Sequence, residues 1–317
     1  MTTATVIVPT LSAKRTARLL DSLAAAGRRF HTLIVDNGTD DPALRAAAGR
    51  LEGAEVIALD SNLGYSRAVN LAVERAEGEA LILLNDDCVV EPGFVDRVVE
   101  PLAPEVGVVM SAAVLRDSQR PELIDTAGME LDATLLVFDY LNGESLSVLD
   151  RGVPDPIGPS AAAAAFWRDA FLEAGGFDEN LFAYWEDVDL VLRLRRAGGR
   201  CRLAPTARGT HEHSATLGSG SSRKNYLIGF GRGYMLRKWG VISPRRLPAV
   251  LARDLVLCAG QAVVDRNLSG LQGRVHGLRA ATRRYDYPAN GPLVAGSSAR
   301  ATLARRWRRR SRLRSAP

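Results

Sequence analysis

Short β-branched segments alternate with amphipathic segments over the first 112 residues, and this alternation constrains the fold more than any other feature of the sequence. Residues 4–9, 32–36, 55–59 and 80–84 have the composition of strands, whereas 14–26 and 65–76 carry apolar residues at helical spacing. Strands that alternate with helices usually pair in parallel, because each helix returns the chain to the same end of the sheet. The sequence therefore predicts an α/β fold, with a mostly parallel sheet flanked by helices.

Polar clusters follow three of the predicted strands, at the carboxyl ends where open α/β sheets bind ligands. They are Asp36-Asn37-Gly38, Asp60-Ser61-Asn62 and Asn85-Asp86-Asp87. The run 80–84 before the third cluster is wholly apolar, which indicates a strand buried on both faces. We therefore expect a binding site along this edge of the sheet.

The third cluster has the chemistry of a metal site. Carboxylate oxygens suit Mg²⁺ or Mn²⁺ holding a diphosphate, although two adjacent acids also fit a simple turn or a cap for the helix expected after Pro92. His211 is a candidate for completing such an oxygen-rich site, and we expect it to follow a strand that ends near Ala204. These residues alone leave the metal and the turn interpretations open.

A second acidic pair, Glu186-Asp187, begins a predicted helix and follows three aromatic residues, Phe182, Tyr184 and Trp185. Acids in a first helical turn often only complement the helix dipole. Aromatic side chains beside a carboxylate also suit a sugar site with a general base. Both interpretations remain open at this point.

The segment 62–70 has the character of an anion-binding loop. Gly64 permits close backbone approach at a helix start, whose free N–H groups attract phosphate, and Arg67 lies one turn into the helix. A plain loop would explain the glycine but not the clustering of Asn62, Arg67 and Asn70.

These segments together resemble glycosyltransferase family 2, and the resemblance covers residues 4 to about 215 in order. It implies the GT-A fold, a single nucleotide-sugar-binding domain and an inverting transfer. The sequence is most similar to the rhamnosyltransferase-like branch, which transfers sugars from dTDP-L-rhamnose and similar donors to growing cell-surface glycans. The motifs are Val6-Ile-Val-Pro-Thr10, Val35-Asp-Asn-Gly38, Asn62-Leu-Gly64, Leu84-Asn-Asp-Asp87, Gly175-Gly-Phe-Asp178 and Trp185-Glu-Asp-Val-Asp-Leu190.

The resemblance also implies a role for each matching position. In the family's Asp-x-Asp metal motif the first position here is Asn85, so Asp87 is the expected ligand, and Asp187 is the expected general base. The nucleotide-sugar would be bound by Pro9, Thr10, Asp36, Asn37, Asn62, Gly64, Arg67 and Asp86, with Asp36 accepting from N3 of uracil or thymine. Asp87 and His211 would hold Mg²⁺ or Mn²⁺, and Trp185 and Glu186 would contact the acceptor.

Charge divides the chain into two unequal parts. Residues 1–221 carry 20 Lys or Arg and 33 Asp or Glu, whereas residues 222–317 carry 21 and 3. We expect a catalytic domain over 1–221, helices packed behind it over 222–292, and a flexible Arg-rich tail over 293–317. Eight arginines in 300–314 could bind an anionic membrane surface, or the tail could simply be solvated. Nucleic acid is not an expected partner, because the predicted catalytic domain is acidic.

Three further features bear on where in the cell the protein is expected to act. Three widely spaced cysteines predict no disulfide framework. We expect no apolar run long enough to cross a bilayer, since Arg253 and Asp254 divide 247–264. With no basic leader at the N-terminus, we expect a cytoplasmic protein, peripheral at the inner face of the cell membrane. The expected acceptor is a glycan or a polyprenyl-diphosphate-linked glycan.

Several alternatives stay open. The donor could be a UDP-hexose rather than a dTDP-sugar, or the chain could be a non-catalytic nucleotide-sugar-binding module, and a homo-oligomer is possible. A dinucleotide-binding oxidoreductase is disfavoured, because the loop after the first strand, Thr10-Leu-Ser-Ala13, lacks a glycine-rich phosphate turn.

Overall fold

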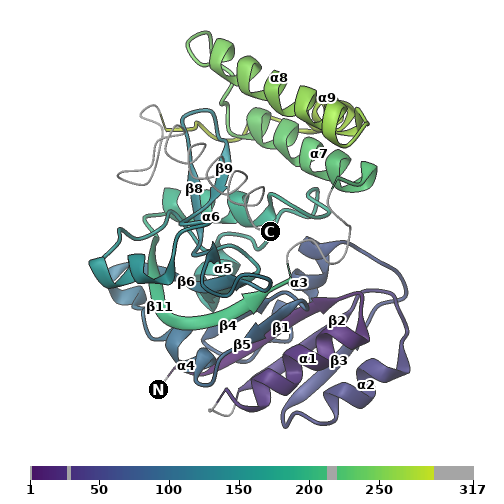
Figure 1. The fold of residues 1–317 in the computed structure, drawn as a ribbon, viewed down its shortest axis with the longest axis vertical. Coiled ribbons are helices and arrows are strands. Elements are labelled where there is room, and N and C mark those ends of the chain that lie inside the picture. The colour runs from purple at the N-terminus through teal and green to yellow at the C-terminus, as the bar shows by residue number, and fades with distance from the viewer. Residues whose placement is uncertain (1, 27–29, 213–219, 289–317) are drawn as a thin grey trace, which may run out of the picture.

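The computed structural model describes residues 2–26, 30–212 and 220–288 (Figure 1). In this part of the chain, a nine-stranded sheet has the order β3-β2-β1-β4-β10-β6-β11-β5, with β7 paired to β6. Its strands are β1 (Ala4–Thr10), β2 (His31–Asp36), β3 (Ala54–Ala58), β4 (Ala80–Leu84), β5 (Cys88–Val90), β6 (Val108–Asp117), β7 (Ile124–Thr126), β10 (Ala163–Trp167) and β11 (Arg200–His211). A separate hairpin pairs β8 (Met129–Leu131) with β9 (Val137–Asp139).

The predicted α/β alternation is confirmed over the first four strands, β1 to β4, which pair in parallel. Beyond β4 the sheet is mixed, because β10 runs antiparallel to both β4 and β6. The helices of this part are α1 (Ala13–Ala24), α2 (Pro42–Ala48), α3 (Tyr65–Val73), α4 (Phe94–Val99), α5 (Arg168–Glu173) and α6 (Glu186–Arg196), with short 3₁₀ turns at Pro104–Val106 and Leu146–Arg151.

Strand β11 is longer than the sequence predicts. We expected it to end near Ala204, but it continues to His211, with a register irregularity between Leu203 and Arg208 in its pairing with β6. Its last residues pair with β5, where His211 lies opposite Cys88. The strand therefore carries the imidazole to the position beside Asp87.

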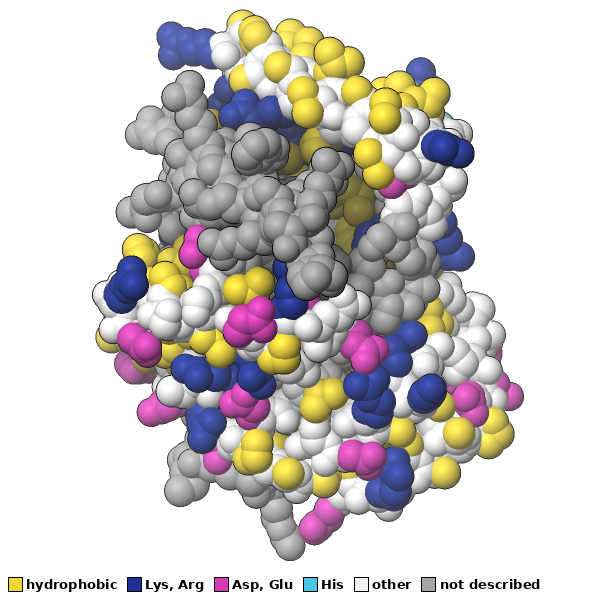
Figure 2. All heavy atoms as spheres, viewed as in Figure 1, with side chains coloured by type: hydrophobic (Ala, Val, Ile, Leu, Met, Phe, Trp, Pro, Cys, Tyr) yellow, Lys and Arg dark blue, Asp and Glu magenta, His cyan; other side chains and the backbone are white. Residues whose placement is uncertain are grey.

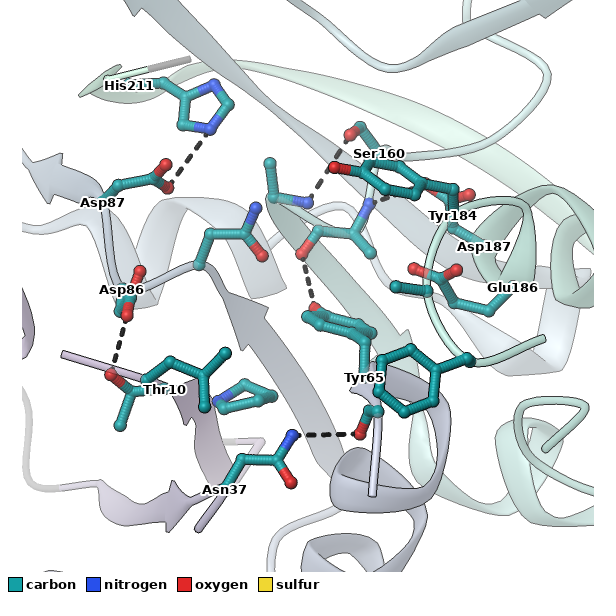
Figure 3. A pocket seen from close by; sticks show the side chains of 18 of the residues that line it. Thr10, Asn37, Tyr65, Asp86, Asp87, Ser160, Tyr184, Glu186, Asp187 and His211 are labelled. Carbon is teal, nitrogen blue, oxygen red and sulfur yellow. Dashed lines mark hydrogen bonds and ion pairs between the residues drawn. The ribbon is translucent and has the colours of Figure 1, made fainter. Parts of the chain in front are cut away.

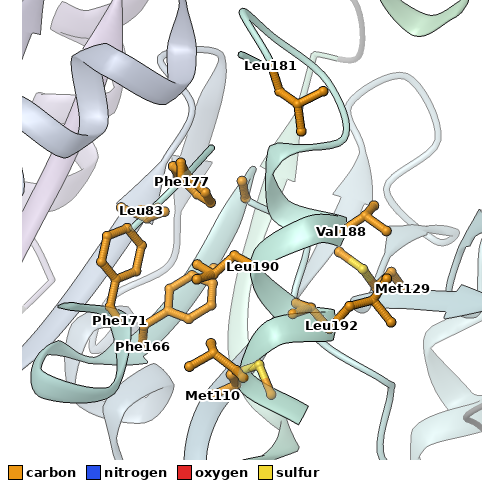
Figure 4. Close-up of a cluster of buried hydrophobic side chains, with 14 of the residues drawn as sticks. Leu83, Met110, Met129, Phe166, Phe171, Phe177, Leu181, Val188, Leu190 and Leu192 are labelled. Carbon is orange, nitrogen blue, oxygen red and sulfur yellow. The ribbon is translucent and has the colours of Figure 1, made fainter. Parts of the chain in front are cut away.

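Apolar side chains form one core on each face of the sheet. Helices α1, α2 and α4 cover one face with residues such as Leu20, Leu44 and Phe94. Helices α3, α5 and α6 cover the other, where Phe171 packs edge-on against Phe166 and Phe177 at centroid distances of 5.8 and 5.4 Å (Figure 4). These two layers hold the carboxyl ends of β1, β2 and β4 in fixed positions.

Three helices follow the sheet and lie together beyond it (Figure 1): α7 (Ser222–Lys238), α8 (Leu247–Val264) and α9 (Ser269–Ala280). Helices α7 and α9 approach closely through glycines on each, such as Gly233, where an added Cβ would lie 2.1 Å from the carbonyl oxygen of Arg274. The end of α7 is tied to α6 through a buried ammonium, since Lys238 Nζ lies 2.6 Å from Asp178 and 2.8 Å from Asp189.

Helix α8 corrects two expectations. We expected the helices of 222–292 to pack behind the catalytic domain, but in α8 only Val250 is buried, so most of this helix is not packed against the rest of the described chain. By length and composition it could also cross a membrane, with a mean hydropathy of 1.6. The residues Arg253 and Asp254 do not interrupt its apolar surface, because both point toward protein rather than outward. The predicted Arg-rich tail, 293–317, lies outside the described residues.

Candidate active site

A cavity of about 490 Å³ opens at the carboxyl ends of β1, β2 and β4, where the sequence predicts a site (Figure 3). Its lining comes from segments far apart in the chain: the ends of these strands, the loop before β10, the start of α6 and the end of β11. The predicted site residues among its lining are Pro9, Thr10, Asn37, Asn62, Gly64, Asp86, Asp87, Trp185, Glu186, Asp187 and His211.

Asp86 is engaged by neighbours on the first βα unit. Its Oδ2 accepts a 2.7 Å hydrogen bond from the hydroxyl of Thr10, and both carboxylate oxygens accept from the guanidinium of Arg15 at 3.0 and 3.1 Å. The bidentate pair neutralises Asp86 and turns it away from metal binding. Asp86 therefore fixes Thr10 and Arg15 at the cavity wall.

Asn37 joins the second strand to the glycine loop. Its Oδ1 accepts from the amide of Leu63 at 2.8 Å, and its Nδ2 donates to the carbonyl of Gly64 at 3.2 Å. Gly64 has φ 86°, and a Cβ there would lie 2.4 Å from the carbonyl oxygen of Phe182. The loop thus requires glycine both for its backbone conformation and for its contact with the segment before α6.

Two predicted nucleotide-binding residues do not line the cavity. Asp36 is buried, and its Oδ1 accepts hydrogen bonds from both the amide and the hydroxyl of Thr39 at 2.9 and 2.6 Å. The half-exposed Arg67 lies 3.8 Å from Glu179 instead. Their assigned contacts with the nucleotide stay predictions, whereas the neighbours Asn37 and Gly64 reach the cavity.

Asp87 and His211 meet at one end of the cavity, where His211 Nε2 lies 3.2 Å from Asp87 Oδ1 (Figure 3). The other imidazole nitrogen, Nδ1, lies 2.8 Å from Asp125 Oδ2 on β7. Burial lowers the pKa of His211, but hydrogen bonds with Asp125 and Asp87 outweigh it and raise this pKa to about 10. In this arrangement the protonated imidazole is held between two carboxylates.

The same residues fit a divalent cation. Apart from its 3.2 Å contact with Nε2 of His211, the buried Oδ1 of Asp87 has no hydrogen-bond partner among the described residues. In metal-bound histidines, a carboxylate commonly accepts a hydrogen bond from one ring nitrogen while the other ring nitrogen binds the metal, and the contact of Asp125 with Nδ1 of His211 matches this arrangement. The thiol of Cys88 also lies within 4.8 Å of these two ligand atoms, but burial raises its pKa well above the usual range and hard cations prefer oxygen. Asp87 and His211 therefore suit a hard divalent cation better than Cys88 does.

The acidic pair lies across the cavity from Asp87 and His211 (Figure 3). Asp187 Oδ2 accepts from the amide of Ala161 at 3.2 Å, and Oδ1 accepts from Val188 at 2.8 Å. Desolvation by burial raises the pKa of Asp187, and these hydrogen bonds only partly offset it. Glu186 is more strongly perturbed: burial first, and then repulsion from Asp187, raise its pKa well above the usual range.

The backbone before this pair is strained. Tyr184 and Trp185 both have positive φ, 69° and 77°, which side-chain-bearing residues rarely adopt. The indole of Trp185 donates a 3.0 Å hydrogen bond to the carbonyl of Ile228 on α7, and its ring packs against Gly231. Helix α7 therefore fixes the turn that presents Glu186 and Asp187.

Sequence reasoning did not find several cavity residues. Asp125 lies in the region 113–157, where the sequence shows little periodicity, and only the pairing of β7 with β6 brings it to His211. Arg15 lies in the first turn of α1, directly after the first strand. A basic residue at that place is a signal for a partner of the acids that follow β4, and it pairs with Asp86. Tyr65 donates a 3.1 Å hydrogen bond to the carbonyl of Ala161, whose amide binds Asp187.

Comparison with known proteins places this site in a family. The family model described as glycosyl transferase family 2 matches residues 5–151. An N-acetylglucosaminyl-diphospho-decaprenol L-rhamnosyltransferase of Mycobacterium tuberculosis is 31% identical over an alignment of 232 residues, and the match covers 63% of this chain and 73% of that protein. The O-antigen biosynthesis protein RfbC of Myxococcus xanthus is 29% identical over 215 residues, 62% of this chain and 16% of its own length.

Solved structures support the fold. GalNAc-T7 with UDP, GalNAc and Mn²⁺ has a TM-score of 0.59 at 16% identity, covering 75% of this chain, which spans about half (48%) of that one. The mannosyltransferase PcManGT of Pyrobaculum calidifontis, with GDP-Man and Mn²⁺, has a TM-score of 0.56 at 17% identity, covering 97% and 80%. The fold is therefore GT-A, as the motifs predict, and the chain belongs to glycosyltransferase family 2, in its rhamnosyltransferase-like branch.

Proposed function

We propose that this protein is an inverting glycosyltransferase that moves a sugar, L-rhamnose from dTDP-L-rhamnose, to a hydroxyl of a lipid-linked glycan. The observation that carries the proposal is the single cavity that holds Thr10 and Asn37 at one wall, Asp87 and His211 at one end and Asp187 across from them. Sugar transfer needs a wall that binds the donor, a pair of residues that holds a cation and a base for the acceptor, all within one cavity. The similarity to an L-rhamnosyltransferase acting on a decaprenol-linked substrate supports the choice of sugar and acceptor.

Asp187 is the proposed general base. Its carboxylate is held by the amides of Ala161 and Val188, so it keeps one orientation as the acceptor hydroxyl approaches. The hydroxyl becomes more acidic as it attacks the anomeric carbon, and Asp187 takes its proton. Attack from the face opposite the nucleotide inverts the anomeric centre without a covalent intermediate. Burial and the neighbouring Asp187 raise the pKa of Glu186, which favours its neutral form and weakens its repulsion of the proposed base.

Asp87 and His211 are the proposed holders of Mg²⁺ or Mn²⁺. When bound, the cation would supply Lewis-acid stabilisation of the charge on the departing diphosphate. Asp125 keeps the imidazole oriented through Nδ1, and Arg15 lies at the cavity wall in its ion pair with Asp86. The nucleoside would lie against Pro9, Thr10 and Asn37, and the acceptor against Trp185 and Glu186.

The setting of the reaction follows from its acceptor. A lipid-linked glycan requires the enzyme to work at a membrane, and the excess of Lys and Arg in 222–317 suits an anionic cytoplasmic surface. We therefore propose a peripheral protein at the inner face of the cell membrane.

The test is a transfer assay with the full chain. dTDP-L-rhamnose, several UDP-hexoses and GDP-mannose are each supplied with Mn²⁺ or Mg²⁺ and a short-chain polyprenyl-diphosphate N-acetylglucosamine. We expect dTDP release and a product heavier by one deoxyhexose only with dTDP-L-rhamnose, and the Asp187→Asn protein should give neither. Preference for a UDP-hexose would replace the donor assignment, and nucleotide-sugar binding without turnover of any donor would favour a non-catalytic module.

A further inference from the structure

Helix α8 has its polarity inverted relative to an ordinary surface helix. Its outward side chains are apolar along its whole length, and the described residues of this face include no charged group. Val256 and Val263, for example, are 72% and 77% exposed. A surface helix of a water-soluble protein normally directs its polar face outward. The exposed members are Leu247, Leu251, Leu255, Val256, Val263 and Val264.

The polar residues of α8 point inward and are paired with the protein. Arg253 lies 2.9 Å from Asp132, and Asp254 lies 3.1 Å from Arg232 and 3.2 Å from Arg274. These ion pairs hold one side of α8 against α7, α9 and the segment after β8. The apolar side consequently has nothing to pack against within the described chain.

The apolar surface continues from α8 onto the start of α9, through Leu268, Leu271 and Val275, which are 61%, 47% and 38% exposed. Figure 2 shows hydrophobic side chains gathered over the end of the molecule where α8 and α9 lie. Soluble proteins rarely expose an apolar surface this continuous unless it binds something. We call this surface, from Leu247 to Val264 with Leu268, Leu271 and Val275, the α8 face.

Charge distinguishes between possible occupants. Residues 222–288 hold 13 Lys or Arg and only 3 Asp or Glu, and the exposed side chains near the α8 face include Arg245, Arg266 and Arg279. Two copies packed through this face would bring like charges together, which opposes pairing. An apolar layer covered by anionic headgroups complements both the apolar centre and its basic surroundings.

We propose that the α8 face inserts into the apolar boundary of a bilayer containing anionic phospholipid, with α8 lying along the membrane plane. Helix α8 is long enough to span, but the pairing of Arg253 and Asp254 keeps one side of it on the protein, so only the outer side enters lipid. The inference deepens the membrane setting of the proposed function, and vesicle binding tests it without any sugar donor.

The experiment is flotation of the full chain with vesicles of phosphatidylcholine containing phosphatidylglycerol. The double variant Leu255→Gln/Val256→Gln should lower the partition constant at least about tenfold, because each aliphatic side chain contributes its burial in lipid. The conservative variant Leu255→Met/Val256→Leu should float like the parent. Val106→Gln and Leu172→Gln are matched controls, since both positions are exposed but lie away from the α8 face, and they should have no effect. Thermal unfolding of each variant verifies the fold.

Unchanged flotation of a folded Leu255→Gln/Val256→Gln protein would overturn the proposal. So would a parent chain that is dimeric by light scattering and does not float, with the double variant monomeric, because the α8 face would then bind a second copy. The failure of the proposed function is separate: a chain that floats through the α8 face but turns over no sugar donor keeps this inference and rejects the enzyme assignment.

Discussion

At the residue scale, Asp187 is the side chain on which turnover depends most directly. We expect Asp187→Asn to keep donor binding and to lower transfer by about 10²-fold or more, because the amide cannot take the proton. Its single oxygen can still accept one of the two hydrogen bonds from Ala161 and Val188, and the other is lost. Calorimetry with the donor and steady-state transfer rates separate the two effects.

The pH dependence provides an independent check on Asp187. Its pKa is raised by burial, and only the deprotonated form serves as a base, so the acidic limb of kcat/KM should lie above the pH at which an ordinary aspartate titrates. Near-normal turnover of Asp187→Asn, or an acidic limb at the ordinary aspartate pKa, would contradict the assignment.

His211 should couple metal binding to pH. Its pKa is raised to about 10 by Asp125 and Asp87, whereas a metal-bound imidazole must be neutral. We therefore expect Mn²⁺ binding to release about one proton and to strengthen about tenfold per pH unit between pH 7 and 9. Titration calorimetry in two buffers of different ionisation enthalpy measures the proton released.

Asp125→Asn is the matching variant. It removes the carboxylate that orients Nδ1 of His211, so metal affinity should fall roughly 10- to 100-fold while metal-free nucleotide binding stays unchanged. Equal metal affinity in the two proteins would remove Asp125 from the site.

The buried carboxyl group of Glu186 lowers the stability of the fold. The pKa of Glu186 is higher in the folded protein than in the unfolded chain, so the free energy of unfolding falls as pH rises above the pKa of an ordinary glutamate. In addition, its buried Oε2 has no hydrogen-bond partner among the described residues. Glu186→Gln should therefore raise Tm by about 2 °C or more at pH 8, with a smaller gain at pH 5. Calorimetric scans at both pH values measure the difference, and a gain that is larger at pH 5 would reverse the sign of the argument.

At the element scale, the contact between α7 and the turn before α6 links the helical region to the site. A Cβ on Gly231 would lie 2.2 Å from Cδ1 of Trp185, so Gly231→Ala should displace the turn that presents Asp187. We expect transfer to fall roughly tenfold or more, because small displacements of catalytic groups are costly, while nucleotide binding is retained.

Gly260 provides the control for this prediction. It lies in α8 with nothing within 4 Å of an added Cβ, so Gly260→Ala should leave transfer unchanged and stabilise the helix slightly. Equal activity of the two alanine variants would show that the α7 contact does not position the site.

The strands show which parts of the fold the sequence could and could not predict. Strands β1 to β4 were found within a residue or two, since buried apolar runs and local turn residues define them. The end of β11 was not, because its last residues are strand only through pairing with β6 and β5. Asp125 was missed for the same reason: a long-range register, not a local pattern, brings it to His211.

The apolar surface of α8 was missed for a different reason. Hydropathy along the sequence counts Arg253 and Asp254 as interruptions, but at helical spacing they share one side of α8 with Gln261, opposite Leu255 and Val256. The position of a charge around a helix, rather than along it, decides which surface is apolar.

At the scale of the whole molecule, the net charge of +5 is the sum of −13 over residues 1–221, with 20 bases and 33 acids, and +18 over residues 222–317, with 21 bases and 3 acids. Charge attraction and apolar insertion should therefore contribute separately to membrane binding. Binding of the full chain to vesicles with anionic lipid should weaken strongly when salt rises from about 0.1 to 1 M, where the screening length shortens from about 10 to about 3 Å. The part that survives high salt should be the part contributed by the α8 face.

The prediction is tested by flotation at both salt concentrations, with neutral vesicles as the control. Neutral vesicles should bind the full chain weakly and without salt dependence, and a chain ending at Pro292 should lose a share of the salt-sensitive binding, because it lacks eight arginines. Leu255→Gln/Val256→Gln should lose mainly the salt-resistant share. If the truncation and the double variant both removed the salt-sensitive part of the binding, charge and apolar contact would not act separately. The division of the molecule into an acidic catalytic part and a basic membrane-facing part would then fail.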